Sequence, residues 1–142
     1  MTKTLILGLV MVGGIALAQS KATDPDVKAR QTIMDHNGGA MKVLVDMIKG
    51  ATPFDAAAAD AAKATLVEDA AAIPAAWTVN ATDPESHSKP EIWTNMEDFT
   101  AKAGALGTAA AALDTTSLDG IKAGMDALGG ACGACHKAYK AS

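Results

Sequence analysis

Helical periodicity recurs in four segments of this 142-residue chain and limits the folds open to it. In each segment apolar residues return at steps of three and four, which places them on one face of a helix. Strand signals are nearly absent, because β-branched residues rarely alternate with polar ones and no hairpin dipeptide separates two apolar runs. Short connections and one longer middle loop then predict an all-α fold, an antiparallel four-helix bundle.

Residues that begin and end helices predict the bounds of the first two segments. The first spans about 24–49, with Pro25 in its first turn and Gly50 directly after its end. The second begins with Thr52 as its cap, because a proline suited to a first turn follows this residue. We expect the second helix to end before Pro74, since proline interrupts a helix.

The third and fourth segments have start signals of the same kind. In "SKPE", Ser88 or Lys89 can cap a helix whose first turn contains Pro90. In "TTSLD", Thr116 or Ser117 can cap the last helix. On that last helix one stripe repeats at helical steps and contains Ile121, Met125, Leu128, Cys132, Cys135 and Tyr139.

The opening stretch "MTKTLILGLVMVGGIALAQS" has the three parts of a secretory signal peptide. Lys3 supplies a positive charge, an apolar run follows, and the small-x-small sequence "ALA" at 16–18 is a cleavage site. The apolar run is short for a membrane span and no basic residue follows it directly. We therefore predict a cleaved signal peptide at 1–18, a mature bundle at 19–142 in the periplasm, and no membrane insertion after processing.

Charge and composition narrow the functions open to the mature chain. Without the signal, eleven basic and sixteen acidic side chains remain, a formal charge of about −5. No basic stripe is present to neutralise phosphates, which argues against nucleic-acid binding. The helices are rich in alanine, whose side chain buries little area, so a large apolar cofactor between them would fill the core. Alanine-rich helices can also pack closely without any ligand.

The string Cys132-Gly-Ala-Cys135-His136 is the attachment signal for c-type haem. On a helix, two thiols three residues apart can reach the two vinyl groups of one haem and form thioethers. His136 follows directly and can present a ring nitrogen to the iron. Covalent attachment also keeps the cofactor bound in an exported protein. We therefore predict one covalent haem c, attached through both cysteines and ligated by His136.

Other chemistries are open to the same string. A structural zinc site needs four ligands, and only His36 and His87 remain as nitrogen donors, without paired spacing. We expect these two histidines at the surface. A thioredoxin-like dithiol needs a preceding strand, and none is predicted. A disulfide suits an exported protein, although so small a loop stabilises little. Haem attachment is favoured, and a bundle with a plain disulfide and no haem stays as an alternative.

A second iron ligand has to come from elsewhere in the chain. Met34 lies one helical turn after Arg30, so both face the same way. The thioether of Met34 can bind iron while Arg30 pairs with a haem propionate. Ordinary core packing explains a methionine at this position as well, since methionine fills irregular space. His36 lies two residues further on, which points it to another face.

These motifs together resemble the class II cytochromes c, the cytochrome c′ family. The resemblance rests on the C-terminal "CGACHKAYK", on "RQTIM" in the first helix, on "PEIW" at the start of the third, and on the four-helix layout. It extends over about residues 24–140. It implies a periplasmic four-helix bundle with covalent haem, in which His136 is the proximal ligand and Arg30, Gln31 and Glu91 lie near the haem edge.

The family divides at the position of Met34. High-spin members often have leucine there, which leaves the iron five-coordinate and able to bind nitric oxide or carbon monoxide. Low-spin members resemble this chain, with a ligating methionine followed by a segment similar to "DHNGGAM". The resemblance thus implies a one-electron carrier, not an enzyme, with His136 and Met34 as axial ligands and periplasmic redox proteins as partners. The gas-binding protein is the alternative.

Two further expectations come from the resemblance. Lys140 stands where the family usually has arginine near the proximal histidine, so the charge is kept but a bidentate or stacked contact is lost. Members of the family often dimerise through their first two helices. A homodimer is therefore an expectation, which no residue in this sequence fixes.

Overall fold

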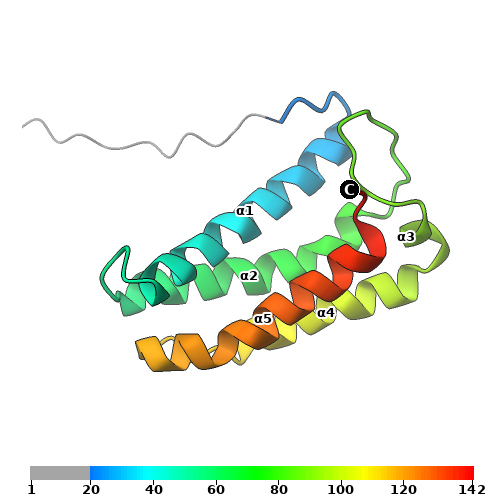
Figure 1. Ribbon diagram of the computed structural model, residues 1–142. Helices are drawn as coiled ribbons and strands as arrows, with labels where there is room; N and C mark the ends of the chain where they lie inside the picture. The colour runs from blue at the N-terminus through cyan, green and yellow to red at the C-terminus, as the bar shows by residue number, and fades with distance from the viewer. Residues whose placement is uncertain (1–19) are drawn as a thin grey trace, which may run out of the picture.

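The computed structural model describes residues 20–142, and the predicted signal peptide at 1–18 lies outside them. The described chain is all-helical, as predicted, and its only strand-like feature is one isolated bridge between Ser88 and Lys140. Four long helices and one short one are present (Figure 1). Their bounds are α1 Pro25–Ile48, α2 Ala56–Ala76, α3 Glu91–Thr94, α4 Met96–Ala111 and α5 Leu118–Tyr139.

The long helices pack in sequence around the bundle. α1 packs against α2, α2 against α4, and α4 against α5, whereas α1 and α5 share few contacts. Figure 1 shows the four helices running along one common direction, with α1 and α5 separating from each other along part of their length. One side of the bundle is thus less tightly closed than the other three. Within residues 20–142, no helix is both long and apolar enough to cross a membrane.

The first helix begins and ends as predicted. Its cap is Asp24, whose carboxylate accepts hydrogen bonds from the backbone N–H groups of Asp26 and Val27 at 2.9 and 3.0 Å. Gly50 follows the end of the helix with a φ of +71°, a conformation that favours glycine.

The predicted bounds of the second helix are wrong at both ends. Asp55, not Thr52, is the cap, since its carboxylate accepts from the N–H groups of the second and third helical residues. Pro74 lies inside the last turn and does not end the helix. The turn persists because Ile73 and Trp77, four positions apart on one face, are both buried in the core. Burial of these side chains offsets the hydrogen bond that proline removes.

The third predicted helix is divided in two. Neither Ser88 nor Lys89 caps it, because Pro90 stands at the cap position of α3 and has no side-chain hydrogen bond to offer. Asn95 then adopts φ −130° and ψ 44° between α3 and α4. Asparagine competes with helix formation through its own polar side chain, so the break falls at a residue that tolerates it. The last helix is capped by Ser117, one of the two predicted residues.

The loop between α2 and α3 is joined to the end of α5. The backbone N–H of Lys89 donates to the carbonyl of Tyr139 at 2.9 Å, and that of Ala141 donates to the carbonyl of His87 at 2.8 Å. These bonds hold the end of α5, directly after the cysteine motif, against the long middle loop.

Candidate functional site

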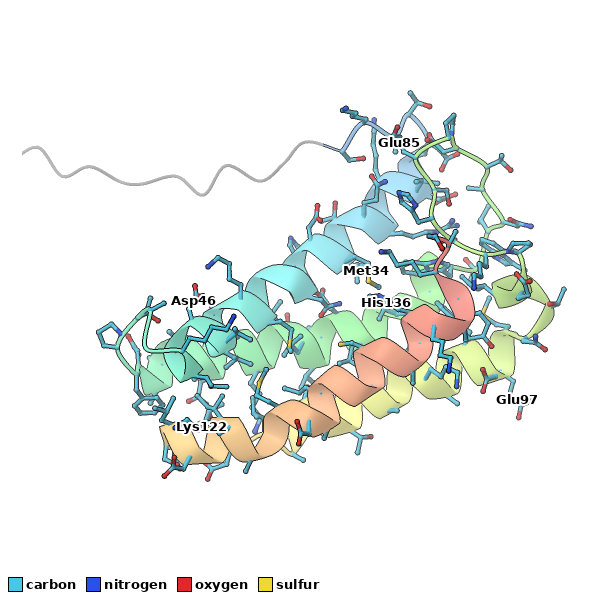
Figure 2. All side chains as sticks on the ribbon, viewed as in Figure 1. Met34, Asp46, Glu85, Glu97, Lys122 and His136 are labelled. Carbon is cyan, nitrogen blue, oxygen red and sulfur yellow. The ribbon has the colours of Figure 1, made fainter. Side chains whose placement is uncertain are left out.

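A cavity of about 480 Å³ lies between α1 and α5, where these helices separate. Its volume falls within the range of about 300–1,000 Å³ that small-molecule and cofactor sites occupy. The lining is mostly apolar and comes from all four long helices and the middle loop. Figure 2 shows Met34 of α1 and His136 of α5 on opposite walls, pointing toward one another.

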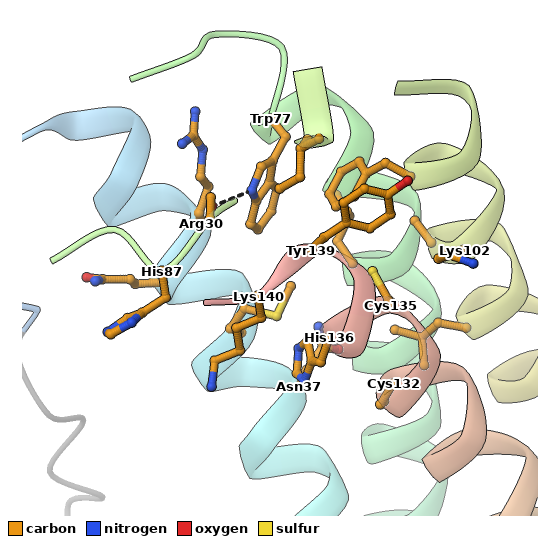
Figure 3. Close-up of a pocket in the computed structure, with 18 of the residues that line it drawn as sticks. Arg30, Asn37, Trp77, His87, Lys102, Cys132, Cys135, His136, Tyr139 and Lys140 are labelled. Carbon is orange, nitrogen blue, oxygen red and sulfur yellow. Dashed lines mark hydrogen bonds between the residues drawn. The ribbon is translucent and has the colours of Figure 1, made fainter. Parts of the chain in front are cut away.

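The α5 wall contains the whole cysteine motif. Cys132 and Cys135 lie one turn apart on α5, both line the cavity, and both are half-buried (Figure 3). Both thiols are free, so neither is used in a disulfide. Burial raises the pKa of each thiol, which keeps it protonated at neutral pH. The two sulfur atoms are thus held at the same wall in a form available for covalent bonding.

His136 lies at the mouth of the same cavity. Although the residue is exposed, desolvation by the surrounding protein, and then the charge of Lys140, lower the pKa of its imidazole. A neutral imidazole offers a nitrogen lone pair to a metal. Among residues 20–142, no three His, Cys, Asp or Glu side chains converge on a position for a metal ion by themselves.

Tyr139 anchors the motif to α4. Its hydroxyl donates to the carboxylate of Asp98 at 2.5 Å, and its ring meets Phe99 edge-on with centroids 5.4 Å apart. This hydrogen bond raises the pKa of Tyr139 to about 12 and lowers the pKa of Asp98. The sequence marks Tyr139 only as one member of an apolar stripe. Its anchoring role depends on a partner 41 residues away, which no local pattern reveals.

Most of the Arg30 guanidinium, on the α1 wall, is already bound by other groups of the protein. The residue is only 3% exposed, and its guanidinium lies 5.5 Å from the centre of the Trp77 ring and 5.3 Å from that of Trp93. Its Nε donates to the carbonyl of Ala76 at 2.9 Å, and its Nη2 donates to the carbonyl of Val79. Burial lowers the pKa of Arg30.

One guanidinium nitrogen of Arg30 is still available. Nη1 is buried and has no hydrogen-bond partner among residues 20–142. Since Arg30 lines the cavity, this nitrogen suits a carboxylate of a bound group. The sequence predicted such pairing but did not predict that two indole rings and two backbone carbonyls would hold the rest of the side chain.

Some of the other predicted residues line the cavity, and the rest lie outside it. Gln31 lines the cavity, and its amide donates to the carbonyl of Glu85 at 2.9 Å. Glu91 is exposed in the first turn of α3 and is not brought to the cavity. His36 and His87 are both exposed, as predicted, and only His87 borders the cavity.

Asn37 is a lining residue that the sequence did not single out. It lies on α1, three residues after Met34, and is 7% exposed. Neither the oxygen nor the nitrogen of its amide has a hydrogen-bond partner among residues 20–142. Buried amides are nearly always paired in native proteins, so an unpaired one on a cavity wall indicates a group that binds there.

These features together fit a haem. The apolar cavity can take a flat ring, and the α5 wall offers two free thiols and a neutral imidazole. The α1 wall offers a thioether from Met34 and a buried, unpaired nitrogen of Arg30. A zinc site or a dithiol centre would use the motif but not the opposite wall.

Comparisons with known proteins agree with this arrangement. The family model of cytochrome c′ matches residues 26–140. The chain is 36% identical over 142 residues to cytochrome c-556 of Agrobacterium fabrum, which covers 98% of this chain and 92% of that protein.

Two solved structures are similar over most of the chain. An NMR-validated structure of oxidised cytochrome c556 from Rhodopseudomonas palustris has a TM-score of 0.76 and 29% identity, and covers 83% of this chain and 97% of its own. Cytochrome c′ from the same organism has a TM-score of 0.77 and 26% identity, with 84% and 98% covered.

Proposed function

Because this chain belongs to the cytochrome c′ family and has haem c as its cofactor, we propose that it is a periplasmic one-electron carrier with His136 and Met34 as axial ligands. The family comprises electron-transfer and gas-binding haem proteins, and the chain is one of these. The proposal selects the first of the two roles. A bound haem supplies an iron that cycles between the ferric and ferrous states.

The attachment residues in this proposal are Cys132, Cys135 and His136. The two thiols would form thioether bonds, and the imidazole would ligate the iron from the α5 side. This assignment is supported by their common position on one cavity wall and by the free state of both thiols. The anchoring bond from Tyr139 to Asp98 supports it as well, because it fixes the turn that carries these residues.

The observation that carries the proposal is the position of Met34 opposite His136 (Figure 2). Methionine and histidine together form an axial ligand pair found in cytochromes c, and methionine ligation raises the reduction potential. With both positions filled by side chains, no substrate binds at the iron. Electrons would then pass through an exposed edge of the cofactor during a brief contact with a redox partner protein, for which a small interface is sufficient.

A second candidate function is the binding of nitric oxide or carbon monoxide at a five-coordinate iron. The likeness to cytochrome c′ of R. palustris favours it, because that structure is as similar to this chain as the c556 structure is. In this case Met34 would cover the distal side without binding the iron.

Absorption spectroscopy of the haem-loaded protein separates the two functions. We expect a low-spin ferric spectrum with the weak red band of methionine ligation. Met34→Leu keeps nearly the same volume but removes the sulfur, so we expect a high-spin protein that binds carbon monoxide. Met41→Leu is the matched control, because Met41 also lies on α1 and lines the cavity. A high-spin spectrum in the unsubstituted protein would refute the carrier.

A periplasmic location is supported by the signal-like residues at 1–18. Mass spectrometry of the exported protein would test it. We expect an N-terminus at residue 19, and a chain that retains Met1 in the cytoplasm would contradict this part of the proposal.

A further inference from the structure

The unpaired amide of Asn37 lies close to the proposed distal ligand. Residues three apart on a helix are neighbours on its surface, so Asn37 and Met34 present adjacent side chains to the cavity. Figure 3 shows Asn37 in the part of the cavity where Cys132 and His136 of the α5 wall also lie. Asn37 is therefore near the place where the axial ligands would meet.

The polar end of the cavity is elsewhere. Arg30 precedes Asn37 by seven residues, about 10 Å along the helix axis. The side chains of Arg30 and Gln31 donate to carbonyls in or next to the middle loop, which marks that end as the place for carboxylates. Asn37 is too far along α1 to share that role. Its partner has to be an acceptor in the inner, apolar part of the cavity.

One turn before Asn37, on the same face of α1, lies the thioether of Met34. The nearer Asp35 and His36 are exposed and do not face Asn37, because residues one or two apart on a helix point in different directions. A thioether sulfur is a weak hydrogen-bond acceptor, and an amide N–H₂ has two donors. We propose that the amide of Asn37 donates a hydrogen bond to the sulfur of Met34 when that sulfur is bound to iron. Asn37 is then a positioning residue that orients the distal ligand. This inference rests on the proposed function, because it requires Met34 to be a ligand.

The hydrogen bond has two consequences. It holds the sulfur in one orientation, so Met34 leaves the iron less readily. It also withdraws electron density from the sulfur and is stronger when the iron is ferrous, because ferric iron draws density from the sulfur itself. The bond therefore favours the ferrous form. Hydrogen bonds to metal ligands are known to adjust reduction potentials in this manner.

The test is Asn37→Leu in the haem-loaded protein, since leucine keeps the volume and removes both donors. A net hydrogen bond of ordinary strength corresponds to roughly a threefold to tenfold change in an equilibrium. Because only the difference in bond strength between the two redox states counts, we expect the reduction equilibrium to shift toward the ferric form by at most that factor, roughly 60 mV or less at 59 mV per tenfold change. We also expect carbon monoxide to replace Met34 several-fold faster, while the ferric protein stays low-spin.

Two further variants complete the experiment. Asn37→Gln keeps an amide donor and should recover part of the potential, which a merely space-filling role would not explain. Met47→Leu changes a buried methionine of α1 outside the cavity and should change neither quantity. If Asn37→Leu is too unstable to isolate, the potential of Asn37→Gln against that of Asn37→Val, whose shorter side chain has no donor, makes the same comparison.

The outcomes separate this inference from the proposed function. If Met34→Leu becomes high-spin but the Asn37 variants keep the potential and the carbon monoxide rate of the unsubstituted protein, Asn37 does not bond to Met34 and only the inference fails. If the unsubstituted protein is high-spin, both fail. A shifted potential together with faster carbon monoxide binding, recovered in part by glutamine, supports both.

Discussion

The two walls of the haem cavity are built in different ways. On the α5 wall, Cys132, Cys135 and His136 lie within five consecutive residues of one helix. On the α1 wall, Arg30 takes its setting from segments far away in the chain. The three residues of the α5 wall are thus placed relative to one another by a single helix, whose end Tyr139 anchors to α4. In the proposed function, the α1 wall selects between electron transfer and gas binding, and the setting of its Arg30 requires the assembled bundle.

The largest effect that tests this contrast is loss of attachment. In the double variant Cys132→Ala, Cys135→Ala, we expect all covalently bound haem to be lost, because no thioether can form. Mass spectrometry of the denatured protein measures this directly. Met34→Leu is the control, since it should keep the mass of the covalent adduct while changing the spin state.

Either of two results would contradict the assignment of attachment to the α5 wall alone. Haem that stays bound to the denatured double variant would show that another residue attaches it. Loss of the adduct in Met34→Leu would show that the α1 wall is needed for attachment as well.

A smaller effect, on the free energy of unfolding, is expected from a substitution of Arg30 on the α1 wall. Arg30→Lys removes the planar group between Trp77 and Trp93 and at least one hydrogen bond to a backbone carbonyl. We expect the free energy of unfolding of the haem-loaded protein to fall by about 2 kcal/mol. Urea unfolding followed by fluorescence measures it. Lys28→Arg, at an exposed position on the same helix, is the control and should change stability by less than about 0.5 kcal/mol.

Equal stability of the Arg30→Lys variant and the unsubstituted protein would contradict the structural role of the guanidinium. The side chain would then serve only the cofactor.

The smallest effect concerns the start of α1 and depends on pH. Asp83 accepts hydrogen bonds from the backbone N–H groups of Thr23, Asp24 and Glu85, and these lower its pKa to about 2. Because the folded-state pKa lies below the ordinary value of 3.8, this carboxylate adds stability above about pH 4. That stability is lost as the pH falls from about 4 toward 2.

Asp83→Asn should therefore be less stable than the unsubstituted protein at neutral pH, and the difference should shrink as the pH falls from about 4 toward 2. Unfolding in urea at a series of pH values measures the difference, and the exposed Asp126→Asn is the control. A difference that stays constant down to about pH 2 would show that Asp83 does not hold the α1 wall by its charge.

The two walls also differ in how much of each could be predicted from the sequence. The stripe on α5 and the haem motif within it could be predicted, because periodicity and spacing are local properties of a sequence. The all-α fold and the bounds of α1 could be predicted for the same reason. Local rules failed at Pro74 and at Asn95. There, burial of Ile73 and Trp77 extends one helix, and a non-helical asparagine divides another.

The α1 wall could not be derived from its own residues. The position of Met34 is compatible with both core packing and ligation, and only the resemblance to a family favoured the ligand. The setting of Arg30 depends on Ala76, 46 residues away, and on two indole rings. Asn37 gave no signal at all, because an asparagine in a helix becomes informative only when its burial and its missing partners are known.

The scarcity of direct contacts between α1 and α5 has an evolutionary consequence. In the proposed function, the cofactor between these helices would provide much of the packing that joins them, so selection for a redox centre and selection for a stable bundle would act on the same side chains. Many substitutions on either wall would then change the yield of folded protein together with the potential. Variation in such a family should therefore concentrate on the outer faces of the helices, and a change of role should need few substitutions on the α1 wall.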